Sequence, residues 1–101
     1  MIVVHAAFPI AADQRDQALE VFRDLVEASH NEPGVIKYEA ATDVSDSNLI
    51  RNVEQYEDED AFQAHLETDH VQDFEEVLPD LLAGEPDIVR FEVDSATDVD
   101  F

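Results

Sequence analysis

The sequence contains no cysteine and no tryptophan among its 101 residues, and no apolar run approaches the ~20 residues of a membrane-spanning helix. Without cysteine, the chain forms no disulfide and holds no zinc ion or iron–sulfur cluster through thiolates. The first residues, Met1 to His5, lack the basic segment of a signal peptide and resemble a strand. We therefore expect a cytoplasmic protein with a single hydrophobic core.

Positive charge is also scarce. The chain has 5 Lys and Arg residues against 26 Asp and Glu residues, a formal net charge of −21, and Lys37 is its single lysine. Such a surface repels nucleic acids and anionic membranes, so neither is an expected partner. The composition resembles that of proteins from salt-accumulating halophilic organisms, because at ~1 M ionic strength the Debye length is ~3 Å and surface carboxylates repel one another little. We predict adaptation to molar salt.

The hydrophobic periodicity predicts six elements in the order β-α-β-β-α-β. Asp13 and Asp58 are placed to cap the two helices, and the second helix is predicted to break near Thr68. This order is typical of the α+β ferredoxin-like fold, a four-stranded antiparallel sheet with both helices on one face. Strands are predicted over residues 2–10, 35–42, 49–56 and 88–93, and helices over 14–30 and 59–83. The domain is predicted to span residues 1–93, followed by an acidic tail over 94–101.

The first predicted strand is apolar on both faces. In a ferredoxin-like fold the helices cover one face of the sheet, and the other face is bare unless a partner covers it. A second copy of the same sheet is the simplest cover. We therefore expect a homodimer that packs through its open sheet faces to form a dimeric α/β barrel.

Two histidines on the second predicted helix are the candidate catalytic residues. His65 is a candidate base, since the pKa of an unperturbed histidine, ~6.5, suits proton abstraction from a bound substrate. His70 is a candidate assistant, but five residues at ~100° each place it ~140° from His65 on an unbroken helix. The two side chains therefore converge only if the helix breaks between them. A zinc site with two histidines on one helix uses a spacing of four, so no metal site is expected.

Six further residues are candidates for the wall of a substrate pocket. A ring at Tyr56 suits stacking on an aromatic substrate, and Glu54, which shares a strand face with it, suits proton acceptance. Each candidate also has a structural interpretation: a cross-strand pair for Glu54 and Tyr56, and the hydrophobic core for the phenylalanines and His5. The same holds for His65, which a hydrogen bond across its helix turn would explain. The predicted substrate-binding residues are Tyr56, Glu54, Asn52, His5, Phe62 and Phe74.

The order of elements and three segments of the sequence resemble those of a known family. The segments are Asn31–Gly34 followed by Val35–Glu39, the strand Val53–Tyr56, and the run Ala61–His70. These resemble the antibiotic biosynthesis monooxygenase (ABM) domain, a group of dimeric α/β barrels that includes small quinol monooxygenases. The resemblance covers about residues 2–93, although family members commonly carry tryptophan where Tyr56 stands here.

The resemblance implies a pocket between the sheet and the helices. It also implies a quinol-like or polycyclic phenolic substrate, oxidised by dioxygen with no metal or flavin cofactor. A deprotonated quinol is electron-rich enough to pass an electron to dioxygen, so the protein need only bind it, promote deprotonation and exclude bulk water.

Two other functions stay open at this point. One is a ligand-binding or stress-response barrel with no chemistry of its own. The other is haem degradation, which related folds perform with a tryptophan and a histidine on the second helix and an asparagine on the first strand. This chain has no tryptophan, His65 stands where the tryptophan is expected and Glu75 where the histidine is expected. Haem degradation is therefore disfavoured.

Overall fold

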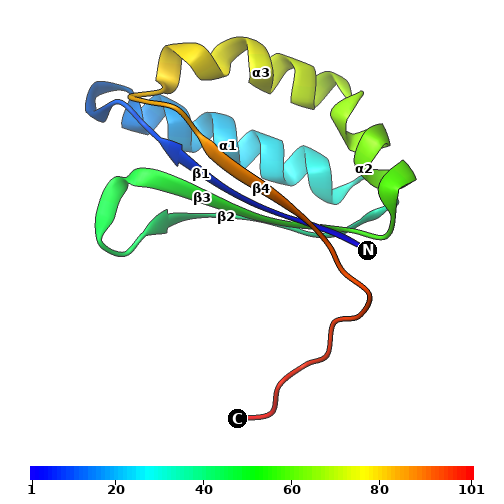
Figure 1. Cartoon of the computed structure of the whole chain (residues 1–101). Helices are drawn as coiled ribbons and strands as arrows, with labels where there is room; N and C mark the ends of the chain where they lie inside the picture. The colour runs from blue at the N-terminus through cyan, green and yellow to red at the C-terminus, as the bar shows by residue number, and fades with distance from the viewer.

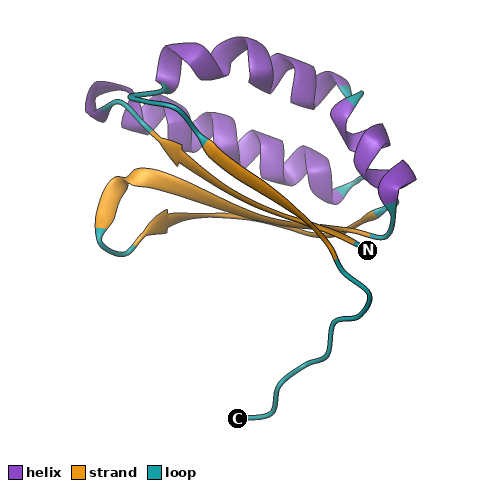
Figure 2. Ribbon diagram, in the orientation of Figure 1, coloured by secondary structure: helices purple, strands orange, loops and turns teal.

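A computed structural model describes all residues, 1–101. Its four strands form one antiparallel sheet in the order β2-β3-β1-β4, and the helices lie together on one face of that sheet (Figures 1 and 2). This confirms the predicted ferredoxin-like α+β fold. The elements are β1 (Ile2–Pro9), the 3₁₀ turn η1 (Ala12–Gln14), α1 (Arg15–His30), β2 (Val35–Asp43), β3 (Asp46–Tyr56), α2 (Glu59–Leu66), α3 (Asp69–Leu81) and β4 (Asp87–Glu92).

The start of α1 differs from the prediction. Residues Ala12–Gln14 form a 3₁₀ turn, in which the Gln14 N–H donates to the Ala11 carbonyl at 2.9 Å. The α-helix therefore begins only at Arg15, and no side chain caps it. The predicted cap at Asp13 is wrong, because Asp13 lies inside the 3₁₀ turn and Gln14 occupies the N-cap position of α1.

The hairpin between β2 and β3 is tighter than predicted. Only Val44 and Ser45 lie outside the two strands, whereas the polar run over residues 43–48 predicts a longer turn. Two aspartates close the hairpin: Asp43 accepts from the Ser45 N–H at 2.9 Å, and Asp46 accepts from the Asn48 N–H at 3.0 Å. These side-chain bonds let acidic residues, which are uncommon in strands, stand at the strand ends.

The predicted break in the second helix is confirmed. Asp58 caps α2 as expected, since its side chain accepts from the Ala61 N–H at 2.8 Å. Thr68 then ends one helix and starts the next: its hydroxyl donates to the His65 carbonyl at 2.7 Å and accepts from the Val71 N–H. One side chain therefore serves a carbonyl at the end of α2 and an N–H group at the start of α3, and the axis turns between them.

The hydrophobic core lies between the helices and the sheet face that they cover. Three phenylalanine rings form its densest part: Phe8 of β1, Phe22 of α1 and Phe74 of α3 meet edge to face, with ring centroids 5.0–6.0 Å apart. The alternate residues of β1 point to this side and are buried, as the period of a strand requires. No helix is both long and apolar enough to cross a membrane.

The opposite face of the sheet is uncovered. Val53 of β3 and Val89 and Phe91 of β4 lie on it and are about two-fifths exposed. After β4 the chain leaves the sheet and extends away from the body of the protein (Figure 1). All residues of this tail, 94–101, are exposed.

Candidate functional site

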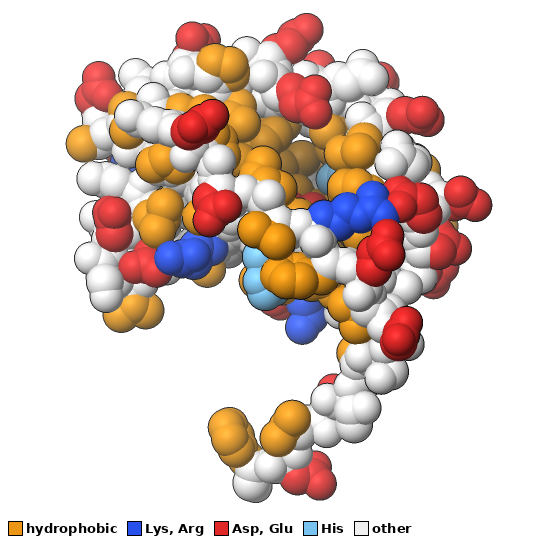
Figure 3. Space-filling model, viewed as in Figure 1, with side chains coloured by type: hydrophobic (Ala, Val, Ile, Leu, Met, Phe, Trp, Pro, Cys, Tyr) orange, Lys and Arg blue, Asp and Glu red, His pale blue; other side chains and the backbone are white.

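A cavity of about 170 Å³ lies between the covered face of the sheet and helices α2 and α3. Figure 3 shows hydrophobic side chains gathered around a hollow on one face of the molecule, with acidic side chains crowding the surrounding surface. Most of the cavity wall is apolar, which is the usual composition of a small-molecule site. Fifteen residues line it: Val4, Ala6, Phe8, Leu25, Tyr38, Asn52, Glu54, Phe62, His65, Leu66, Val71, Phe74, Glu75, Leu78 and Ile88.

Strand β3 contributes Asn52 and Glu54 to the polar part of the cavity wall, and Tyr56 on the same face of the strand supports them. Asn52, Glu54 and Tyr56 alternate along this strand and point to the helices, and all three are buried. The Tyr56 hydroxyl donates to the Glu54 carboxylate at 2.6 Å, so the tyrosine holds the carboxylate in place. The Asn52 Oδ1 atom is buried without a hydrogen-bond partner in the chain. An unpaired buried acceptor costs free energy, and a ligand hydroxyl that reached Oδ1 from the cavity would satisfy it.

Burial determines how the groups around this wall ionise. It raises the pKa of Glu54, against the opposing effects of the Tyr56 hydroxyl and of the His65 ring in its protonated form. Burial, and next the charge of Glu54, raise the pKa values of Tyr38 and Tyr56. Both phenols therefore stay protonated and act as hydrogen-bond donors, not as bases.

His65, on the last turn of α2, is the basic group of the cavity wall. Its ring lies between two tyrosine rings, with centroids 5.3 Å from Tyr38 and 5.2 Å from Tyr56. Its Nδ1 atom lies 2.8 Å from Glu32 Oε2, whereas its Nε2 atom makes no hydrogen bond within the chain. A carboxylate only accepts, so it favours the tautomer with the proton on Nδ1. The neutral ring then keeps a free lone pair on Nε2.

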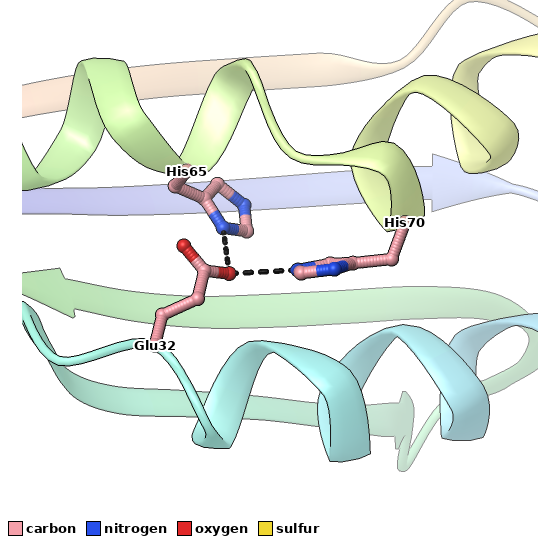
Figure 4. A group of neighbouring side chains, drawn as sticks. All are labelled: Glu32, His65 and His70. Atoms are coloured by element: carbon pink, nitrogen blue, oxygen red, sulfur yellow. Dashed lines mark hydrogen bonds and ion pairs between the residues drawn. The ribbon is translucent and has the colours of Figure 1, made fainter.

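His70 contacts the same carboxylate from the start of α3. Its Nε2 atom lies 2.7 Å from Glu32 Oε2, so both imidazoles point at one oxygen (Figure 4). On an unbroken helix the side chains of His65 and His70 would point in different directions. The break at Thr68 places them on two helices and lets them converge on Glu32. The three side chains place ligand-type atoms within 4.8 Å of one another, a set that could hold a metal ion.

Glu32 is the functional candidate that sequence reasoning missed. It lies in the loop after α1, 33 residues from His65, and no local pattern distinguishes it from the other acidic residues. Gly34 lets this loop approach α2 closely, because a Cβ atom there would overlap the Cβ atom of Ala61. The only signal was its place in the Asn31–Gly34 segment that carries the family resemblance.

The other predicted residues divide into two groups. Phe62 and Phe74 line the cavity together with Asn52 and Glu54, whereas Tyr56 lies behind Glu54 and is fully buried. The expectation that His5 lines the pocket does not hold. Neighbouring Val4 and Ala6 point to the cavity, so His5 points to the opposite face, where it is exposed and packs edge to face on Phe91 at 5.2 Å.

The chain is similar to known proteins along most of its length. It is 32% identical over 93 residues to "Putative monooxygenase YcnE" of Bacillus subtilis (strain 168), covering 92% of this chain and 98% of that protein. The solved structure of PA3566 from Pseudomonas aeruginosa is 26% identical with a TM-score of 0.85, covering 93% of this chain and 94% of that one. Rv0793 from Mycobacterium tuberculosis has a TM-score of 0.87 at 18% identity, covering 95% and 98%, and this likeness shows the fold alone.

These comparisons define the class and then the family. The class is an α+β domain of ferredoxin-like fold with a cavity under its helices. The sequence model of the family described as antibiotic biosynthesis monooxygenase matches residues 1–77. The chain therefore belongs to the antibiotic biosynthesis monooxygenase family. The family and the name of the Bacillus relative support a monooxygenase-type function.

Proposed function

We propose that this protein is a cofactor-independent monooxygenase that oxidises a quinol-like phenol with dioxygen. The observation that carries the proposal is the pairing of two free acceptors on one apolar cavity: Nε2 of His65 and Oδ1 of Asn52. A quinol carries two hydroxyl donors on one ring, so it can satisfy both acceptors. In this arrangement His65 takes one phenolic proton, while Asn52 orients the ring through the other hydroxyl.

The size of the cavity favours a one-ring quinol over a polycyclic phenol. Its volume is about 170 Å³, and a dry apolar cavity of about 150 Å³ accommodates one benzene ring. The aromatic residues Phe62 and Phe74 border this space and exclude water from the ring. A second fused ring would have to extend out of the cavity toward solvent or move the side chains apart.

The reaction balances without a further reductant. Loss of a proton to His65 gives a phenolate, which transfers one electron to dioxygen, and recombination forms a new carbon–oxygen bond. Cleavage of the oxygen–oxygen bond leaves one oxygen atom on the ring and releases the other as water. The quinol supplies all four electrons that dioxygen requires and becomes a hydroxyquinone, so one dioxygen is consumed for each quinol.

The test measures whether an oxygen atom of dioxygen enters the product. Purified protein in molar KCl, incubated with a panel of one-ring hydroquinones under ¹⁸O₂, should give a hydroxyquinone carrying one ¹⁸O atom faster than autoxidation does. Heat-denatured protein in the same buffer gives the autoxidation rate. Consumption of dioxygen without label in the product would identify an oxidase. No protein-dependent turnover, together with saturable binding of the quinols, would favour the ligand-binding barrel.

We also propose that two copies form a barrel through the open face of the sheet. Val53, Val89 and Phe91 form an exposed apolar patch there, and a second copy of the sheet would bury it. Replacing Phe91 with aspartate should yield a monomer in light scattering after size-exclusion chromatography in molar KCl. Val44, which is fully exposed at the hairpin turn, gives the matched control: Val44→Asp should leave a dimer. A monomeric wild-type chain would contradict the proposal.

A further inference from the structure

The cluster of Glu32, His65 and His70 has the composition of a transition-metal site. Its three side chains come from three segments: the loop after α1, the end of α2 and the start of α3. Their ligand atoms all lie within 4.8 Å of one another (Figure 4). Two imidazoles and one carboxylate form the donor set that binds catalytic zinc and non-haem iron in many proteins. We propose that this cluster binds a divalent transition-metal cation, for which Zn²⁺ is the probe.

Side-chain rotations bring the three ligand atoms of the cluster to the spacing that a cation requires. Glu32 Oε2 lies 2.8 Å from His65 Nδ1 and 2.7 Å from His70 Nε2. Ligand atoms at 2.0–2.2 Å from one cation lie about 3 Å apart in octahedral geometry and slightly farther in tetrahedral geometry. The two imidazole nitrogens lie within 4.8 Å of each other and must reach the same spacing, so a rotation of Glu32 away from the imidazoles, together with a shift of the more exposed His70 ring, opens the site. The cation replaces the protons that now join the carboxylate to the two rings.

Burial gives the cluster a closed side and an open side. The His65 side chain is 4% exposed, so its position is fixed by the surrounding protein. The His70 side chain is 27% exposed, which leaves a route for the cation and room for water as a further ligand. Three protein ligands with an open position are the arrangement of catalytic zinc sites, in contrast to the four protein ligands of a closed structural site.

A bound cation would change the chemistry of His65, and this consequence rests on the proposed function. Coordination uses the Nδ1 lone pair, so the neutral ring must carry its proton on Nε2. The nitrogen that we propose as the base then becomes a donor and can no longer accept the phenolic proton. The site therefore acts as an inhibitory switch: turnover requires the cluster to be free of metal.

Calorimetric titration with ZnCl₂ tests binding without reference to activity. We use the untagged chain in molar KCl, where the numerous surface carboxylates are screened and bind cations weakly. The expected result is one ion per chain, with at least a tenfold loss of affinity in His70→Ala. His5→Ala is the matched control, because it removes an imidazole on the face of the sheet opposite the cluster. It should bind as the wild type does.

Circular dichroism verifies that each variant is folded, and Glu32→Gln, which keeps the shape of the side chain, provides a second ligand deletion. Absence of saturable binding overturns the site, as does equal affinity in the wild type and His70→Ala.

Oxygen uptake then tests the switch separately. Uptake should fall in proportion to zinc occupancy in the wild type, and full uptake at full occupancy overturns the switch. If the protein shows no uptake at all, the proposed function fails while the calorimetric result for the site still stands.

Discussion

Oxygen-dependent turnover of a quinol should fall by about 10²- to 10⁴-fold when His65 is replaced with alanine, the usual contribution of a general base. The reason is geometric. His65 offers the one imidazole nitrogen on the cavity wall that has no hydrogen bond within the chain, whereas Tyr38 and Tyr56 stay protonated and one oxygen of Glu54 accepts a bond from Tyr56. Initial rates of oxygen uptake, corrected for autoxidation, measure the loss.

Chemical rescue separates a base from a structural residue. Added imidazole should restore part of the turnover of His65→Ala, since the vacated volume is that of one imidazole ring. A variant that had lost only packing would gain no activity in this way. Glu32→Gln should lower turnover less, by about tenfold, because Glu32 is a positioning residue that acts through His65. Unchanged turnover in a folded His65→Ala variant would exclude His65 as the base.

The sequence predicted the fold well because its signals were local. Alternation along β1 and β3, the cap at Asp58 and the break near Thr68 each depend on residues a few positions apart. The same reasoning failed at Asp13, where an extra 3₁₀ turn before α1 shifts the start of the helix by one residue. A capping residue predicts that a helix starts nearby, but the register of the first turn also depends on how the chain leaves β1.

The candidate site was predictable only where a single element supplies it. Asn52 and Glu54 lie on one face of β3, so alternation alone places them together. Which face of β1 meets the cavity was not decided by the sequence, because both faces are apolar, and His5 was therefore assigned to the wrong side. Glu32 joins His65 through packing of the α1–β2 loop on α2, a contact that no periodicity encodes.

The thermal midpoint of the protein should rise steadily with KCl, by more than about 10 °C between 0.1 M and 3 M. A net charge of −21 on 101 residues cannot be neutralised internally, because the chain has only 5 Lys and Arg residues. Relief of about 3 kcal/mol of repulsion would shift the midpoint of a domain of this size by about 12–24 °C. Differential scanning fluorimetry over a KCl series measures the slope, and a midpoint indifferent to salt would contradict halophilic adaptation.

A charge variant distinguishes screening of repulsion from a general effect of salt on apolar burial. Asp73, Glu76 and Asp80 are exposed on α3 and spaced by three and four residues, so their carboxylates repel one another along one helix face. The triple variant Asp73→Asn, Glu76→Gln and Asp80→Asn removes three negative charges and buries no additional apolar surface. If screening is the cause, its midpoint should be higher than that of the wild type at low salt and should rise less steeply with KCl. Parallel curves for the two proteins would instead assign the salt response to burial of apolar surface, which both share.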